Sequence, residues 1–178
     1  MKINHLLREN RQKIVKTWFD LILETYPAQT ATFLKTQNNP FHNPVGHTIF
    51  EGIEGLFEEL LQGRGPDRAA VCLDNIIRIR ALQELTPSRA ISFIFLLKKV
   101  IRETLAHDIR KHHLFEELMT LESSIDDLAA LSFDIFMKCR EKLYELKAKE
   151  ARNLTIRLLQ RENREEEKSR EKNSTAGL

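Results

Sequence analysis

Residues 88–107 read SRAISFIFLLKKVIRETLAH, and this stretch decides the fold. From Ala90 to Ile101 it is apolar almost all round, and only one serine and two lysines interrupt it. A helix that is apolar on every side is either buried among other helices or spans a bilayer, and twelve residues are too few to span. We therefore expect this stretch to be the central helix of a helical bundle.

Residues that break regular structure lie almost entirely before this helix. All five prolines and five of the six glycines precede Ser88, and Gly177 is the only one of either type that follows it. Strands need turns, and turns draw on Gly and Pro for their backbone dihedrals, so a sheet is not expected in residues 88–176. The predicted fold class is all-α, with long helix in the second half.

The first half supplies shorter amphipathic helices. Apolar residues recur at helical spacing from Ile3 to about Tyr26, where Pro27 stops the first helix. Residues 67–84 form another predicted helix, with Leu82 on its apolar face.

Two residue pairs mark predicted helix starts. Asn43 is expected to cap a helix whose first residue is Pro44 and which ends at Gly63. Thr86 and Pro87 are expected to play the same two roles at the start of the central helix.

Apolar residues after the central helix follow a heptad-like spacing of alternating four and three residues. They fall at 114, 118, 121, 125 and 128, followed by Ser132, Ile135 and Cys139. Ser123, Ser124 and the acidic pair at 126 and 127 indicate a break and a fresh helix start within this run.

The end of the chain is strongly charged. Beyond Gln160 the segment RENREEEKSREK has ten charged residues in twelve, which is typical of a solvated helix end or of a disordered tail. We therefore divide the chain into a domain over residues 1–145 and a charged helical extension with a disordered tail over residues 146–178.

Composition excludes several function classes. Lys and Arg number 28 against 26 Asp and Glu, a net charge of +2, so there is no bulk attraction to nucleic acid or anionic lipid. No apolar signal core or stretch of spanning length is present, so we expect a cytoplasmic protein without membrane insertion. The two cysteines lack the spacing of a zinc site or a disulfide scaffold.

No catalytic or cofactor motif is visible. The sequence has no nucleophile elbow, P-loop or dinucleotide fingerprint, so we predict neither an enzyme nor a resident cofactor. None of the six histidines pairs at the four-residue spacing of a helical metal site, and no metal is expected. A single histidine can hold haem, and if haem is bound His47 and His107 are the candidate ligands. Otherwise the histidines are surface or capping residues.

Polar residues near helix ends are the remaining site candidates. Arg80 and Gln83 sit beside apolar neighbours, so both are expected to be partly buried and to need partners. Arg80 either ties this corner to a carboxylate or to backbone carbonyls, or contacts a ligand or partner. In the loop that contains Phe41 and Asn43, packing and capping are favoured over binding.

Three of these segments carry a family resemblance. The resemblance lies in Trp18 with Tyr26–Pro27, in FHNPVGHT at 41–48, and above all in IRALQELTPSRAISFIFLLKKVIRE at 79–103. With these segments the sequence resembles the RsbRD-type N-terminal domain family, named for the RsbT co-antagonist proteins of bacterial stressosomes. The resemblance covers residues 3–145. It implies a helical, globin-like sensory domain that usually lacks haem, dimerises, and passes a signal through its last helix.

In relatives of stressosome type that helix leads into a STAS domain, and the chain, ending at Leu178, is expected to lack one. The resemblance, the absent catalytic set and the heptad-like run from Leu114 to Cys139 predict a non-catalytic regulatory protein that forms a homodimer and presents its C-terminal helix to an unidentified regulatory partner. A haem or small-ligand sensor is the main alternative. An enzyme built on dispersed carboxylates and histidines, and a charged tail that docks onto a larger complex, are the others.

Overall fold

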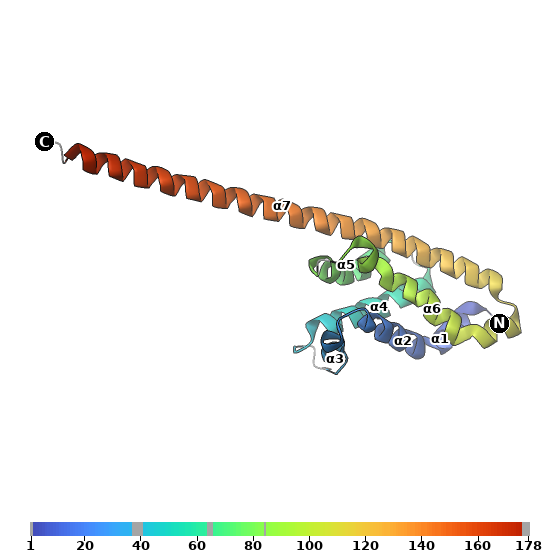
Figure 1. The fold of residues 1–178 in the computed structure, drawn as a ribbon. Coiled ribbons are helices and arrows are strands. Elements are labelled where there is room, and N and C mark those ends of the chain that lie inside the picture. The colour runs from blue at the N-terminus through green and yellow to red at the C-terminus, as the bar shows by residue number, and fades with distance from the viewer. Residues whose placement is uncertain (1, 37–40, 64–65, 84, 176–178) are drawn as a thin grey trace. The chain divides into compact units, whose positions relative to one another are not determined.

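The computed structural model describes residues 2–36, 41–63, 66–83 and 85–175, and within these ranges it is built from helices alone (Figure 1). The predicted all-α fold with a long C-terminal helix is confirmed. The helices are α1 (Ile3–Glu9), α2 (Arg11–Glu24), α3 (Ala28–Thr36), α4 (Pro44–Gln62), α5 (Pro66–Leu82), α6 (Pro87–His112) and α7 (Phe115–Thr175).

The chain forms two compact units, Met1–Cys139 and Arg140–Leu178. The first unit holds α1 to α6 and the first part of α7, and the second unit begins within α7. The charged segment beyond Gln160, predicted as either a helix end or a disordered tail, is helical, since α7 continues to Thr175; residues 176–178 lie outside the described residues. The domain boundary expected after residue 145 stays a prediction.

The N-terminal helix is interrupted where the sequence predicted continuity. At Asn10 the backbone leaves helical geometry (φ −97°, ψ 10°), so α1 and α2 are separate helices. Both the backbone N–H and the side-chain amide of Asn10 donate to the carbonyl of Leu6, at 3.0 and 2.9 Å. A side chain that competes for backbone acceptors in this way disfavours the helix interior, and apolar periodicity does not report it.

The start and end of α4 are as predicted. Asn43 is its N-cap and accepts a hydrogen bond from the Gly46 N–H at 2.8 Å, and Pro44 is the first helical residue. The helix closes at Gly63, whose φ of 60° lies in the left-handed region that favours glycine. Asn43 also donates from Nδ2 to the carbonyl of Leu34, at 2.8 Å, so one side chain caps α4 and holds the end of α3.

Helix α6 carries a large share of the core of the first unit. Its buried residues are Ala90, Phe93, Ile94, Leu97, Val100, Ile101, Leu105 and Ile109. The expected burial on every side is nevertheless wrong, because Phe95 is 46% exposed. Pro87 begins the helix after Thr86 as predicted, but the Thr86 side chain makes no capping hydrogen bond.

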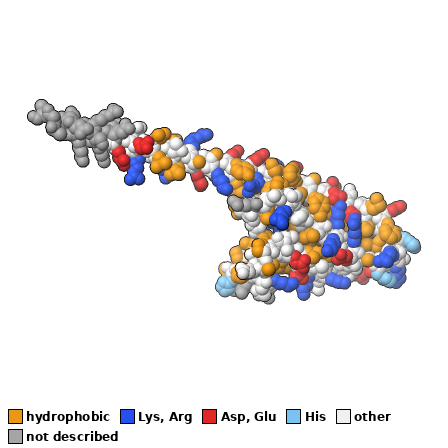
Figure 2. Space-filling view, viewed as in Figure 1, with side chains coloured by type: hydrophobic (Ala, Val, Ile, Leu, Met, Phe, Trp, Pro, Cys, Tyr) orange, Lys and Arg blue, Asp and Glu red, His pale blue; other side chains and the backbone are white. Residues whose placement is uncertain are grey.

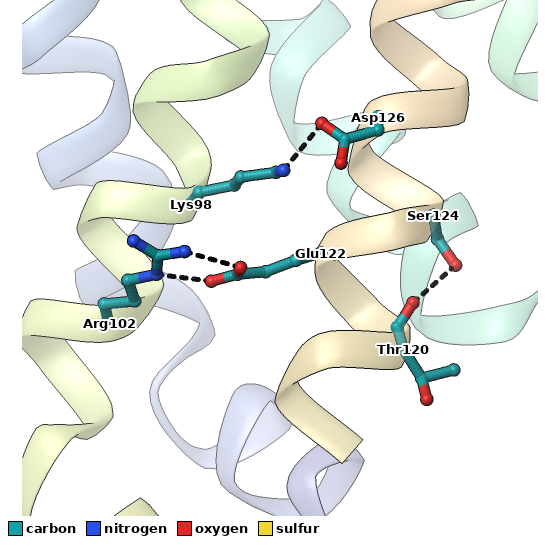
Figure 3. Close-up of polar contacts among 6 residues, drawn as sticks. All are labelled: Lys98, Arg102, Thr120, Glu122, Ser124 and Asp126. Carbon is teal, nitrogen blue, oxygen red and sulfur yellow. Dashed lines mark hydrogen bonds and ion pairs between the residues drawn. The ribbon is translucent and has the colours of Figure 1, made fainter. Parts of the chain in front are cut away.

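The first part of α7 packs along α6 as one unbroken helix. The break predicted at residues 123–127 is wrong, because Ser124 turns its hydroxyl back onto the Thr120 carbonyl, at 3.3 Å, and leaves the backbone ladder intact (Figure 3). The heptad-like run forms the inner side of this helix, where Leu114, Leu121, Ile125 and Ser132 are buried. The Ser132 hydroxyl donates to the Leu128 carbonyl at 2.7 Å, so its burial leaves no unmet polar group.

Two ion pairs set the antiparallel register of α6 and α7. Lys98 Nζ lies 2.6 Å from Asp126 Oδ1, and Arg102 Nη2 donates to Glu122 Oε2 at 2.6 Å (Figure 3). Moving four residues forward along α6, from Lys98 to Arg102, corresponds to moving four residues back along α7, from Asp126 to Glu122. The same register brings Ile91 level with Phe133.

Replacement of Asn43 by alanine is expected to lower the free energy of unfolding by about 2 kcal/mol, because it removes an N-cap and a buried amide bond together. Urea denaturation measures this change. The control is Asn75→Ala at an exposed position of α5, which is expected to leave stability unchanged or slightly higher. Equal effects of the two substitutions would contradict the assignment.

Candidate functional site

A buried arginine fixes the corner between α5 and α6. Arg80 is 1% exposed, and its Nε donates to the Ala90 carbonyl at 2.8 Å while Nη2 donates to the Arg89 carbonyl at 3.0 Å. Its guanidinium also lies 5.6 Å from the ring centroid of Tyr26 and 5.5 Å from that of Phe93. Of the two structural partners that the sequence left open, carboxylate or backbone carbonyls, the structure shows the carbonyls.

The charge of Arg80 is compensated without an acidic side chain in the described part of the chain. Burial lowers the pKa of Arg80, and the phenol of Tyr26, whose oxygen lies 3.5 Å from Nη1, partly opposes that shift. Carbonyl dipoles and the negative faces of two aromatic rings stabilise the guanidinium instead. Such a site suits arginine because its planar fork reaches two carbonyls at once.

Trp18 fastens α2 to the same part of α6. Its ring is fully buried and stacks on Phe93 with centroids 6.4 Å apart, and its Nε1 donates to the Phe93 carbonyl at 2.7 Å. Phe93 is therefore shared by Trp18 and Arg80. The two residues together hold the first two turns of α6 by its backbone and by one aromatic ring.

The expected burial of Gln83 is wrong, since its side chain is exposed. Leu82, predicted to lie on an apolar face, is 66% exposed. Helix α5 ends at Leu82, so the helical spacing that would carry Gln83 onto the face of Arg80 no longer applies. Pro87 lies exposed at the first position of α6, where it serves as a helix start.

The predictions for the loop before α4 are partly confirmed and partly wrong. Capping is confirmed for Asn43, which is 4% exposed, and Pro44 is an exposed first residue of the helix. Packing is wrong for Phe41, whose side chain is 92% exposed. The two candidate haem ligands are both exposed and lie on different helices, with His47 Nε2 3.1 Å from Glu51 Oε1 on α4 and His107 on α6. Within the described ranges no three metal-ligating side chains come together.

Sequence reasoning missed a cavity of about 720 Å³ between α2, α3 and α4, which we call the α2–α3–α4 groove. It is lined by Arg11, Gln12, Val15, Lys16, Phe19, Asp20, Leu34, Lys35, Asn43, Gly46, His47, Phe50 and Glu54. Its residues come from three helices, so no single stretch of sequence carries a periodic signal for it. Only Asn43 and His47 of this lining were singled out as candidates from the sequence.

Comparison with known families finds a match over most of the chain. The family model described as the RsbT co-antagonist protein rsbRD N-terminal domain matches residues 12–151. The chain belongs to this family. The match includes Trp18, Asn43 and Arg80, and thus both the corner and most of the groove lining. No curated protein and no solved structure matches, so the globin-like part of the expectation stays a prediction.

The rsbRD N-terminal family is one of regulatory, stressosome-related domains. In this chain Arg80 and Trp18, which hold the start of α6, pack against aromatic rings and donate hydrogen bonds to backbone carbonyls. None of the described helices is long and apolar enough to cross a membrane.

Replacement of Arg80 by methionine is expected to lower the free energy of unfolding by about 2 kcal/mol, because it leaves the carbonyls of Ala90 and Arg89 without their buried donor. Thermal and urea unfolding measure the change. Arg78→Met, which removes an exposed guanidinium two residues away, is expected to cost less than about 0.5 kcal/mol. An Arg80→Met protein as stable as the parent would show that these contacts do not hold the corner.

Proposed function

We propose that this chain is a non-catalytic regulatory protein that dimerises and signals through α7 to a protein partner. The observation that carries the proposal is an apolar stripe on the outer side of α7. Four large side chains form it, and their exposed fractions are 52% for Phe115, 72% for Met119, 42% for Phe133 and 38% for Met137.

The four residues share one face of the helix. Phe115 and Met119 are four residues apart, as are Phe133 and Met137, and five helical turns separate the two pairs. Between them lie Glu122 and Asp126, which pair with α6, so the stripe runs along the edge of the helix next to α6, outside its buried side, and these two charged residues divide it. Exposed Phe95 of α6 adds to the same surface near its Phe133 end. Figure 2 shows hydrophobic side chains on the surface of this unit among charged ones.

This stripe replaces the association seam suggested by the heptad-like run. That run is buried against the core of its own unit, so it cannot also face a second chain. The outer stripe is not buried against the core, so it can contact a second chain. Burial of such a side chain stabilises association by roughly 1.5 to 3 kcal/mol, and a two-fold interface counts every contact twice. Each of the two exposed apolar pairs is a candidate for protein–protein contact.

The second unit offers a surface for a partner. From Arg140 onward α7 exposes six large hydrophobic side chains, interspersed with charged ones (Figure 2). They are Tyr144, Leu146, Leu154, Ile156, Leu158 and Leu159, each at least 46% exposed. Leu154 and Leu158 are four residues apart and share one side of the helix, and such a pair can lie in a groove or against another helix.

The haem alternative finds little support in the chain's own residues. His47 is 45% exposed and its Nε2 faces Glu51, so an axial bond to iron at Nε2 would displace that pair. His107 is exposed on α6. The small-ligand alternative is favoured by the α2–α3–α4 groove, whose lining is mostly apolar.

Dimerisation is tested by light scattering on the Phe133→Glu, Met137→Glu double variant. Placing two carboxylates in an apolar interface should convert a dimeric parent to monomer at the same concentration, and because the two side chains are only 42% and 38% exposed in the protomer, circular dichroism checks that the variant still folds. The control Lys138→Glu, exposed on another face of α7, should remain dimeric. A monomeric parent, or a double variant that stays dimeric, would overturn this part of the proposal.

Signalling through α7 is tested by comparing the partners captured from native extract by the full chain and by a chain truncated at Leu146. The truncated chain should lose the partner, and so should a Leu154→Glu, Leu158→Glu variant of the full chain, because both remove the exposed apolar face. Lys149→Glu is the control for a charge change in the same segment and should keep the partner. Retention of every partner by the truncated chain would contradict the proposal.

A further inference from the structure

The α2–α3–α4 groove has the dimensions and construction of a small-molecule site. Its volume, about 720 Å³, lies within the range of ligand pockets. Its walls are held in place, because Asn43 ties the end of α3 to the start of α4 and Lys35 of α3 pairs with Asp20 of α2 at 2.9 Å. A ligand there would therefore meet a largely formed surface.

Aromatic and aliphatic side chains make the floor of the groove. Phe19 and Phe50 meet edge to face, with ring centroids 5.3 Å apart and planes at 86°, and both rings are only partly buried. Val15 and Leu34 continue the apolar surface. An aromatic pair that leaves ring surface open can take a further ring in offset or edge-to-face contact.

The rim of the groove is charged but not strongly positive, because Arg11 and His47 of the lining also contact two carboxylates beside it, Glu58 and Glu51. Both carboxylates in the lining are already paired, Asp20 with Lys35 and Glu54 with Arg11 Nη2 at 2.9 Å. Lys16 lines the groove and forms no ion pair with any residue the structure describes. The N-terminal turn of α4 reaches the groove at Gly46, and its dipole also favours an anion.

We propose that the α2–α3–α4 groove binds a small aromatic carboxylate, with its ring against Phe19 and Phe50 and its carboxylate at Lys16. The chemistry of the two parts sets the class: an apolar body to cover the floor, and one negative charge for Lys16, for which the described part of the chain supplies no ion-pair partner. Binding here goes beyond the proposed function, since nothing in it requires dimerisation or the second unit.

Isothermal titration calorimetry of the full chain with 2-naphthoate tests the proposal. Saturable binding at one site per protomer is expected, and the neutral analogue 2-naphthalenemethanol should bind about tenfold more weakly, because it lacks the charge-assisted contact. Lys16→Glu should weaken naphthoate binding by at least about tenfold. The matched control Lys13→Glu, an exposed lysine one turn earlier on α2 that does not line the groove, should bind within about twofold of the parent.

Absence of saturable binding, equal affinity for the acid and the alcohol, or equal losses in the two lysine variants would each overturn the proposal. Circular dichroism checks that both variants fold, and Lys16→Gln repeats the test without a new charge. Amide chemical shifts locate the site: naphthoate should perturb Phe19, Gly46 and Phe50, and a response centred on the α7 stripe would refute the assignment. Light scattering on the same samples reports dimerisation separately, so failure of the proposed function and failure of the groove proposal are distinguishable.

Discussion

The first unit depends on how the start of α6 is held. Arg80 reaches the carbonyls of Ala90 and Arg89 while Trp18 reaches that of Phe93, so residues from α5 and α2 bind backbone carbonyls in the first two turns of one helix. Arg80 is buried without an acidic partner in the described chain. The free-energy cost of burying its charge is therefore offset only while these carbonyls and the two flanking rings stay in place. The direction of α6 is thereby fixed, and α6 in turn fixes the register of α7 through its ion pairs.

That register gives the first part of α7 two different faces. One face is buried in the core with Ile125 and Ser132, and the other leaves Met119 and Met137 exposed. A helix with one apolar side in the core and another at the surface can pack within its own chain and contact a second chain at the same time. The same helix continues into the second unit. A structural change at the outer stripe can therefore be transmitted along the helix to the exposed residues beyond Arg140.

Local signals in the sequence predicted much of this fold. The lack of Gly and Pro from Ser88 to residue 176 predicted the long helices, and Asn43–Pro44 and Gly63 marked the limits of α4 because capping chemistry is local. What failed depends on neighbours: the break at Asn10, the exposure of Gln83 and Phe95, and the direction faced by the heptad-like run. Spacing shows that residues share a helix face, but it does not show which face meets the core. The buried state of Arg80 followed from its apolar neighbours, whereas the groove joins three helices and left no local trace.

The central claim is that the outer stripe of α7 pairs two chains, and methionine oxidation measures it most directly because Met119 and Met137 both lie on the stripe. The chain is treated with dilute peroxide over a range of protein concentrations, and sulfoxide formation at each methionine is followed by mass spectrometry against an added methionine peptide. The account predicts that Met137 oxidises increasingly slowly relative to that peptide as concentration rises. Oxidation rates of Met119 and Met137, relative to that peptide, that do not change with protein concentration would contradict it.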